Sequence, residues 1–151
     1  DGKLIAFHQM GSLTIIQSDG KGFKKLADNA GTCPFGIAWS PDSSRIAWIG
    51  GTCGGGLDRQ DTVWVINSDG TAINMIYKSN DTELAYGQIA WSPDGKSVAA
   101  AMESSMVYLI DASCSNKPNG CDETSRMTIN EIPKHWMHNF YPQWAGEKVA
   151  R

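Results

Sequence analysis

The feature that most constrains the fold of this chain is an internal repeat. Ile-Ala-Trp-Ser-Pro-Asp at residues 37–42 recurs without change at residues 89–94. The shared Trp39 and Trp91 are therefore 52 residues apart, and a weaker copy, Tyr-Pro-Gln-Trp, ends at Trp144, 53 residues further on. Self-similarity at a fixed period of this order indicates that one structural unit is stacked several times.

Each unit predicts four short β-strands joined by tight turns. Ser-Pro-Asp and Ser-Asp-Gly recur between short runs rich in Ile, Val, Trp and Tyr. Pro presets φ and Asp and Gly accept turn dihedrals, while the apolar residue types prefer strands. No segment shows a sustained helical period bounded by caps. A β-sandwich needs no period, so the repeat favours blades of a β-propeller, each with four antiparallel strands.

We therefore expect an all-β chain with about three blades, which is a partial propeller or half of a six-bladed ring. The single partial β-propeller domain spans residues 1–151, with approximate blades at 1–36, 37–88 and 89–139 and the start of a further blade at 140–151. Asp-Gly-Lys at the start matches the turn before the second strand, so the first blade is expected to lack its innermost strand. Because propellers typically need ~4–8 blades to close, we expect either the rest of a longer propeller chain or a homodimer completing the ring. The start and the end within a repeat favour the longer chain.

Trp-Ser-Pro-Asp-Gly-Lys and the apolar strand after it, at residues 91–99, resemble the repeat of TolB-like propellers. Residues 39–47 look like a degenerate form of the same repeat, whereas residues 144–147 have lost the Ser-Pro-Asp and residues 50–58 are an insertion. The resemblance implies a non-enzymatic protein-interaction or ligand-binding propeller module in the periplasm or outside the cell. The same repeat also occurs beside the hydrolase domain of prolyl-oligopeptidase-like enzymes and in oligogalacturonate-lyase-like proteins. An accessory propeller of such a hydrolase, or a metal-dependent lyase-like propeller, is therefore the alternative.

The four cysteines predict two disulfides. If the strands flanking the first Ser-Pro-Asp turn pair as a regular hairpin, Cys33 falls opposite residue 52, one step from Cys53 and within disulfide reach. Cys114 and Cys121 bracket a polar turn that a disulfide would close. A four-cysteine zinc site would favour Cys-x-x-Cys pairs, and neither spacing fits. Disulfides imply an oxidising compartment, so we expect a periplasmic or extracellular location.

No residue pattern predicts catalysis or a cofactor. Ser40 and Ser92 precede Pro in structural turns, and no Gly-x-Ser-x-Gly elbow is present. His135 and His138 are the candidate metal ligands, but residues three apart in a strand point to opposite faces, which favours a packing role. His8 stands alone at a predicted strand end, where a packing or surface role is expected.

The expected binding surface combines loop aromatics with a charged corner. Its candidate residues are Asp58, Arg59, Trp136, Phe140 and Tyr141. Aromatic side chains are frequent anchors of protein interfaces, whereas Asp58 and Arg59 have a local ion pair as their structural alternative. The net charge is −3 and no dense Lys/Arg cluster occurs, which argues against a nucleic-acid partner. The apolar runs are too short to span a membrane. The resemblance to TolB-like propellers, together with the loop aromatics, implies a protein partner.

Overall fold

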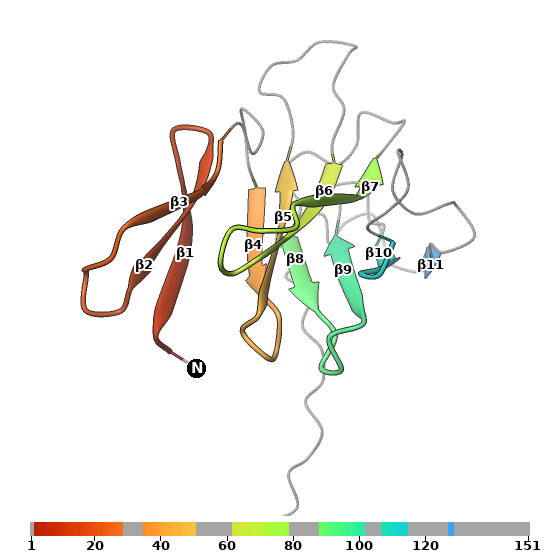
Figure 1. The fold of residues 1–151 in the computed structure, drawn as a ribbon. Helices are drawn as coiled ribbons and strands as arrows, with labels where there is room; N and C mark the ends of the chain where they lie inside the picture. The colour runs from red at the N-terminus through yellow and green to blue at the C-terminus, as the bar shows by residue number, and fades with distance from the viewer. Residues whose placement is uncertain are drawn as a thin grey trace, which may run out of the picture.

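The computed structural model describes residues 2–28, 35–50, 62–78, 88–101, 107–114 and 127–128. Within these residues the chain forms three antiparallel sheets and no helix, and the sheets stand side by side (Figure 1). The first sheet contains β1 (Leu4–Gln9), β2 (Ser12–Gln17) and β3 (Lys24–Ala27). The second contains β4 (Phe35–Trp39), β5 (Arg45–Gly50), β6 (Thr62–Asn67) and β7 (Asn74–Lys78). The third contains β8 (Gln88–Trp91), β9 (Ser97–Ala101), β10 (Val107–Asp111) and β11 (Met127–Thr128).

Each sheet is a meander in which every strand pairs with the next along the chain. The all-β class and the four-stranded antiparallel unit predicted from the repeat are therefore confirmed. The second and third sheets begin at Phe35 and Gln88, two residues and one residue before the unit boundaries predicted at 37 and 89. The first sheet has three described strands, and β1 takes the place that β5 and β9 take in the other two.

The strand registers define which residues are equivalent in the three sheets. Ser18, Ser68 and Ala112 donate their backbone N–H groups to the carbonyl oxygens of Lys3, Ser44 and Lys96. The next pairs along are Leu4 with Gln17, Arg45 with Asn67, and Ser97 with Asp111. It follows that Ile5, Ile46 and Val98 are equivalent, as are Ala6, Ala47 and Ala99.

Two apolar clusters hold the sheets face to face. The first cluster joins Leu13, Ile15 and Ala27 of the first sheet to Ile46, Trp48 and Ile66 of the second. The second cluster joins Ala47, Ile49, Val63, Val65, Ile76 and Tyr77 of the second sheet to Ile89, Trp91, Val98, Ala100, Tyr108, Ile110 and Ala112 of the third. Successive residues of β5 therefore serve opposite interfaces, which explains why this strand is apolar on both faces. Each fully buried Ile or Val side chain contributes about 1.5–3 kcal/mol.

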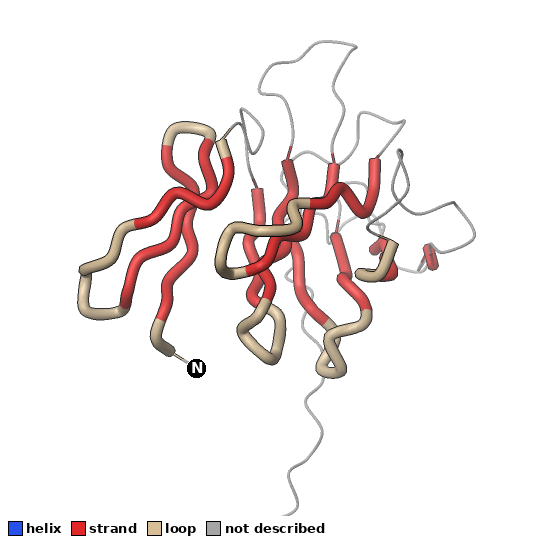
Figure 2. The backbone as a smooth tube through the Cα atoms, in the orientation of Figure 1, coloured by secondary structure: helices blue, strands red, loops and turns tan. Residues whose placement is uncertain are grey.

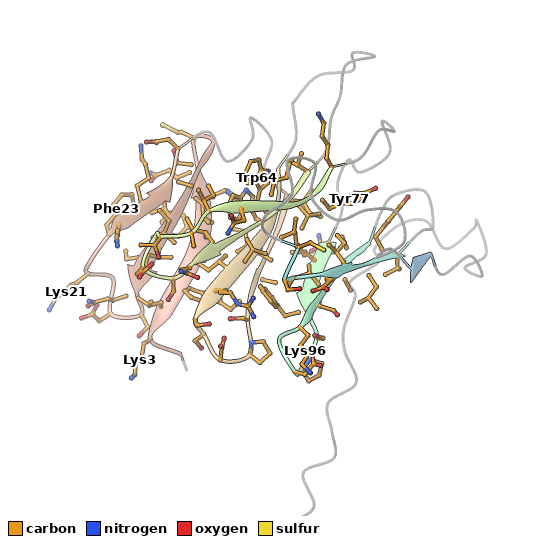
Figure 3. All side chains as sticks on the ribbon, turned by 45° about the vertical axis from the view of Figure 1, so that its right-hand side comes forward. Lys3, Lys21, Phe23, Trp64, Tyr77 and Lys96 are labelled. Carbon is orange, nitrogen blue, oxygen red and sulfur yellow. The ribbon has the colours of Figure 1, made fainter. Side chains whose placement is uncertain are left out.

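Aromatic pairs reinforce the sheet stack. Trp48 and Trp64 lie opposite each other on β5 and β6, with their rings stacked at 6.1 Å and an interplanar angle of 14°. Tyr77 of the second sheet and Tyr108 of the third meet with ring centroids 5.5 Å apart. Figure 3 labels Trp64 and Tyr77 on the two strands that follow β5. Aromatic pairs at these separations add about 0.5–1.5 kcal/mol beyond their buried area.

The hairpin around the first Ser-Pro-Asp turn has the predicted register only near the turn. Ser40 donates its backbone N–H to the Arg45 carbonyl oxygen at 2.9 Å, as expected. The register then shifts between Phe35 and Ile37, where the intervening Gly36 has a φ of 53°. The constant register used to place Cys33 opposite residue 52 is therefore wrong beyond Ile37, because a bulge adds a residue to β4.

Candidate functional site

The Ser-Pro-Asp turn of the second sheet is held by a local hydrogen-bond network. The Ser40 hydroxyl donates to Asp42 Oδ1 at 2.6 Å and accepts the Arg45 backbone N–H at 2.9 Å. Ser44 donates to the same carboxylate through its backbone N–H at 3.1 Å and through its hydroxyl at 2.7 Å. These bonds, with that of Ser40 the largest cause, lower the pKa of Asp42 to about 2.

The turn of the third sheet repeats this network. The Ser92 hydroxyl donates to Asp94 Oδ1 at 2.6 Å and accepts the Ser97 backbone N–H at 2.9 Å. The hydroxyl bond and the Lys96 backbone N–H, 3.0 Å from Asp94 Oδ1, hold the pKa of Asp94 below its usual value. An ionised carboxylate with a lowered pKa is a weak general base. The repeated serines and aspartates therefore stabilise turns, as the sequence predicts for Ser40 and Ser92.

The contact between the second and third sheets centres on Arg45 and Trp91. The Arg45 guanidinium carbon lies 4.5 Å from the centroid of the Trp91 ring, a cation–π arrangement. Arg45 Nη2 also donates to the Gly95 carbonyl oxygen at 2.7 Å. The Trp91 indole Nε1 donates to the Ala38 carbonyl oxygen at 3.0 Å, so β8 is bonded to β4 across the interface. The two Ser-Pro-Asp turns, drawn as tan loops in Figure 2, project from the same end of their sheets.

The contact between the first and second sheets has a different arrangement. Trp39 occupies the position of Trp91, and Leu4 occupies that of Arg45. Both residues are partly buried against the first cluster. Within the described part of the chain, the Trp39 indole N–H has no hydrogen-bond acceptor. Instead, Lys24 Nζ donates to the Asp69 carbonyl oxygen at 2.6 Å, at the outer side of the two sheets.

His8 is a partly buried histidine on β1. It pairs with Leu13, a residue of the first cluster, and both of its ring nitrogens are buried. A hydrogen bond with the Ser12 backbone opposes the effect of this burial on the pKa of His8 but is the smaller cause. Desolvation is the largest cause that lowers the pKa of His8, to about 4, so the imidazole is neutral at physiological pH. The packing role expected from the sequence agrees with this burial.

The face of the first sheet that points away from the second is apolar and open. Ile5 is 52% exposed although its equivalent Ile46 is fully buried, and Phe23 is 55% exposed. The Phe7 and Phe23 rings lie 6.2 Å apart and form the centre of this open face. Figure 3 labels Phe23 at the outer margin of the first sheet. On this open face, the first sheet leaves exposed the positions whose equivalents in the second sheet are buried against the first sheet.

The site residues expected from the sequence fall mostly outside the described residues. This holds for Asp58, Arg59, Trp136, Phe140, Tyr141, His135, His138, Cys33, Cys53 and Cys121. Cys114 is described: it packs partly buried against the second cluster and is not a free thiol. Its predicted pairing with Cys121 and that of Cys33 with Cys53 stay predictions. The described residues contain no group of three or more His, Cys, Asp or Glu side chains placed to hold a metal ion. They also contain no helix long and apolar enough to cross a membrane.

Four-stranded meanders stacked face to face, with β4 against β8, define a β-propeller architecture. The chain is similar in structure to a tricorn protease, with a TM-score of 0.57 and 13% identity over 84% of this chain and 16% of that one. It is also similar to an oligogalacturonate lyase in complex with manganese, with a TM-score of 0.56 and 13% identity over 77% of this chain and 32% of that one. A puromycin hydrolase matches with a TM-score of 0.52 and 18% identity, over 74% of this chain and 18% of that one. These are propeller-type proteins, so the chain is a partial β-propeller that spans about a third or less of each.

No protein-family model matches the chain, and no curated protein matches it either. At identities below 20%, the solved structures carry information about the fold alone.

Proposed function

We propose that this chain is a segment of a propeller that works as a non-enzymatic protein-interaction module, as its resemblance to TolB-like repeats implies. The observation that supports the first part of this proposal, that the chain is a segment of a propeller, is the open apolar face around Ile5, Phe7 and Phe23. Contiguous exposed apolar surface on a folded protein commonly marks a site that another polypeptide covers. In the propeller itself that cover is a further blade, from a longer chain or from a second copy.

The surface for an external partner is proposed to lie on the loops that differ between repeats. The repeated polar residues of the Ser-Pro-Asp turns are already engaged in the turns, so recognition falls to unrepeated residues. Asp58, Arg59, Trp136, Phe140 and Tyr141 remain the proposed contacts, and the periplasm or the extracellular space remains the proposed location, supported by the four cysteines.

The alternative is a propeller that serves catalysis. The similarity to hydrolases and to a manganese-bound lyase supports this alternative only through the shared fold. In the hydrolase version the propeller accompanies a catalytic domain. In the lyase-like version His135 and His138 would be metal ligands.

One experiment separates these functions. The full-length protein is assayed for peptide hydrolysis and for oligogalacturonate cleavage with manganese, and its partners are captured by cross-linking in its native compartment. We expect no turnover, and a captured partner that is lost in Trp136→Ala and Phe140→Ala. Ile73→Ala, which removes an exposed side chain between β6 and β7, is the matched control and retains the partner. Manganese-dependent turnover that disappears in His135→Ala or His138→Ala would contradict the proposal.

A further inference from the structure

Three tight turns among the described residues contain an Asp-Gly pair. These pairs are Asp19-Gly20 between β2 and β3, Asp69-Gly70 between β6 and β7, and Asp94-Gly95 between β8 and β9. In such a pair the backbone nitrogen of the glycine can reach the carboxyl carbon of the aspartate, because glycine has no Cβ that hinders the approach. Each turn therefore contains the two groups that react in spontaneous isoaspartate formation.

The reaction requires a protonated carboxyl group and a free backbone nitrogen. The glycine nitrogen forms a bond to the carboxyl carbon, which closes a five-membered succinimide, and the carboxyl hydroxyl leaves as water. A second water molecule opens the ring at the main-chain carbonyl, so that the chain then runs through the former side chain. One water is lost and one is gained, and no oxidant or cofactor takes part. Hydrogen bonds that keep the carboxylate ionised and fixed therefore slow the reaction.

The attacking nitrogen is held in the same way in all three turns. The N–H group of each glycine donates to the carbonyl oxygen of the residue three positions earlier, at 2.9 Å in each turn. The glycines also share a left-handed backbone, with φ of 82° at Gly20, 90° at Gly70 and 69° at Gly95. Differences in reactivity are therefore expected to come from the carboxyl groups.

The Asp69 carboxylate is fixed by the threonine two residues later. Thr71 donates to Asp69 Oδ1 through its backbone N–H at 2.8 Å and through its hydroxyl at 2.6 Å. The Asn67 side-chain amide donates in turn to the Thr71 hydroxyl at 2.9 Å. The two bonds from Thr71, with the hydroxyl bond the larger cause, lower the pKa of Asp69. The protonated form that reacts is therefore scarce at Asp69.

The Asp19 carboxylate lacks a hydroxyl donor of this kind. Its Oδ1 accepts the Lys21 backbone N–H at 2.9 Å, and its Oδ2 lies 3.9 Å from the Lys21 ammonium nitrogen. Lys21 occupies the position of Thr71 and has no hydroxyl, whereas Asp94 receives the Ser92 hydroxyl at 2.6 Å. All of these bonds form within a single turn, so the difference does not depend on the neighbouring sheets.

We propose that Asp19-Gly20 is a site of spontaneous isoaspartate formation in the folded chain, and that hydroxyl donors protect the turns at Asp69 and Asp94. The product adds one carbon atom to the main chain between β2 and β3. This turn is closed by the bond from the Gln17 N–H to the Lys21 carbonyl oxygen at 2.8 Å, which the longer chain disturbs. The site is separate from the loops proposed to bind a partner.

The test incubates the whole chain in water enriched in oxygen-18, at mildly acidic pH and below its unfolding temperature. Each ring opening adds one heavy oxygen, and peptide mapping in ordinary water locates it, while electron-transfer fragmentation distinguishes isoaspartate from aspartate. We expect Asp19 to be labelled about fivefold faster than Asp69 or Asp94, which corresponds to the loss of one hydrogen bond. Labelling of Asp69 or Asp94 at the rate of Asp19, or faster, overturns the inference.

The same experiment in concentrated guanidinium chloride removes the turns. Two of the pairs follow serine and the third follows proline, and all three end in glycine. We therefore expect the three labelling rates to become similar in the unfolded chain. A ranking that persists in guanidinium chloride would mean that local sequence sets the rates, and it would overturn the inference.

Matched substitutions exchange the group that distinguishes the two equivalent turns. Lys21→Thr supplies a hydroxyl and should slow labelling at Asp19 about fivefold. Lys21→Val removes the same ammonium group without adding a hydroxyl, so it is the control and should not slow labelling. Thr71→Val removes only the hydroxyl and should speed labelling at Asp69 about fivefold.

The third turn is the internal reference for these variants. Labelling at Asp94 should keep its rate in every variant, which reports that the fold is retained. Equal slowing by Lys21→Thr and Lys21→Val overturns the inference, as does an unchanged rate at Asp69 in Thr71→Val.

Discussion

Ser43 and Gly95 occupy the same position in successive Ser-Pro-Asp turns, and both have left-handed backbones, with φ of 59° and 69°. A left-handed conformation costs an L-residue about 1–2 kcal/mol and is free of this cost for glycine. We therefore predict that Ser43→Gly raises the free energy of unfolding by about 0.5–1 kcal/mol, measured by denaturant titration.

The reverse substitution gives the matched experiment. A Cβ at Gly95 would meet Arg45 Nη2 at 3.6 Å and Pro41 Cδ at 3.9 Å, which are ordinary contacts. Gly95→Ser should therefore lower the free energy of unfolding by a similar amount through backbone conformation alone. Opposite signs for the two variants support the explanation, and equal signs would refute it.

The Arg45–Trp91 contact predicts a measurable coupling between the second and third sheets. Arg45→Leu introduces the residue found at the equivalent position of the first sheet and removes both the cation–π contact and the bond to Gly95. We expect a loss of about 1–2 kcal/mol, and a coupling of about 0.5–1 kcal/mol in a double-mutant cycle with Trp91→Phe. Lys96→Leu, on the exposed adjacent turn, is the control and should show no coupling with Trp91→Phe.

The hydrogen bonds of the Ser40 hydroxyl predict that its removal lowers the free energy of unfolding by destabilising the Ser-Pro-Asp turn. Ser40→Ala leaves the Arg45 backbone N–H without its acceptor and removes one of the donors to Asp42, so we expect about 1–2 kcal/mol of destabilisation. Ser92→Ala should behave in the same way in the third sheet. Ser18→Ala, on an exposed turn of the first sheet, is the control and should leave the stability nearly unchanged. Thermal unfolding of the three variants measures the difference.

His8 predicts a loss of stability in mild acid. Its pKa is about 4 in the folded chain against 6.5 for the free side chain, so the unfolded chain binds protons more readily. The stability that neutral His8 contributes is present above pH 6.5 and is lost as the pH falls toward 4, by about 1–2 kcal/mol after allowance for its partial exposure. His8→Ile gives β1 the residue type that β5 has at the equivalent position, Ile49. This variant should flatten the pH dependence of the free energy of unfolding between pH 6.5 and pH 4. An unchanged slope would show that other groups are responsible.

The cysteines predict two disulfides that mass spectrometry can assign. The intact and reduced chains should differ in mass by four hydrogens under denaturing conditions. Proteolysis without reduction should release one linked pair containing Cys33 and Cys53 and another containing Cys114 and Cys121. Four free thiols in oxidised material would remove the argument for a periplasmic or extracellular location.

The repeat was sufficient to predict strands and sheets, because strand pairing follows from turn chemistry and apolar pattern. The conformation of the β1–β2 turn could not be predicted in this way. Met10 and Gly11 both have positive φ, but the Asn-Gly or Asp-Gly pair that is usual for such hairpins is absent. The bulge at Gly36 does have a sequence signal, because an isolated glycine within a strand often marks a bulge, but the sequence alone does not give the register shift that it causes.

The contacts between sheets were not predictable from the repeat. Leu4 and Ser97 stand at the positions equivalent to Arg45 in the other two sheets. This difference between the repeats is the one sequence signal of the Arg45–Trp91 contact. The Trp91 indole donates to the Ala38 carbonyl oxygen, whereas Trp39 has no such acceptor among the described residues, and this difference depends on a side-chain direction that sequence alone does not give. The expected loop site, around Trp136 and Phe140, lies outside the described residues.

The bond from Trp91 to Ala38 gives the stack of sheets a direction. The interface between the second and third sheets joins two different surfaces, the donor side of one sheet and the acceptor side of the preceding one, which is a heterologous contact. Heterologous contacts close into rings when the rotation per unit divides a full turn, and otherwise they continue as open filaments. A protein built in this way therefore depends on ring closure to limit its own assembly, and an unclosed arc of sheets would tend to polymerise head to tail.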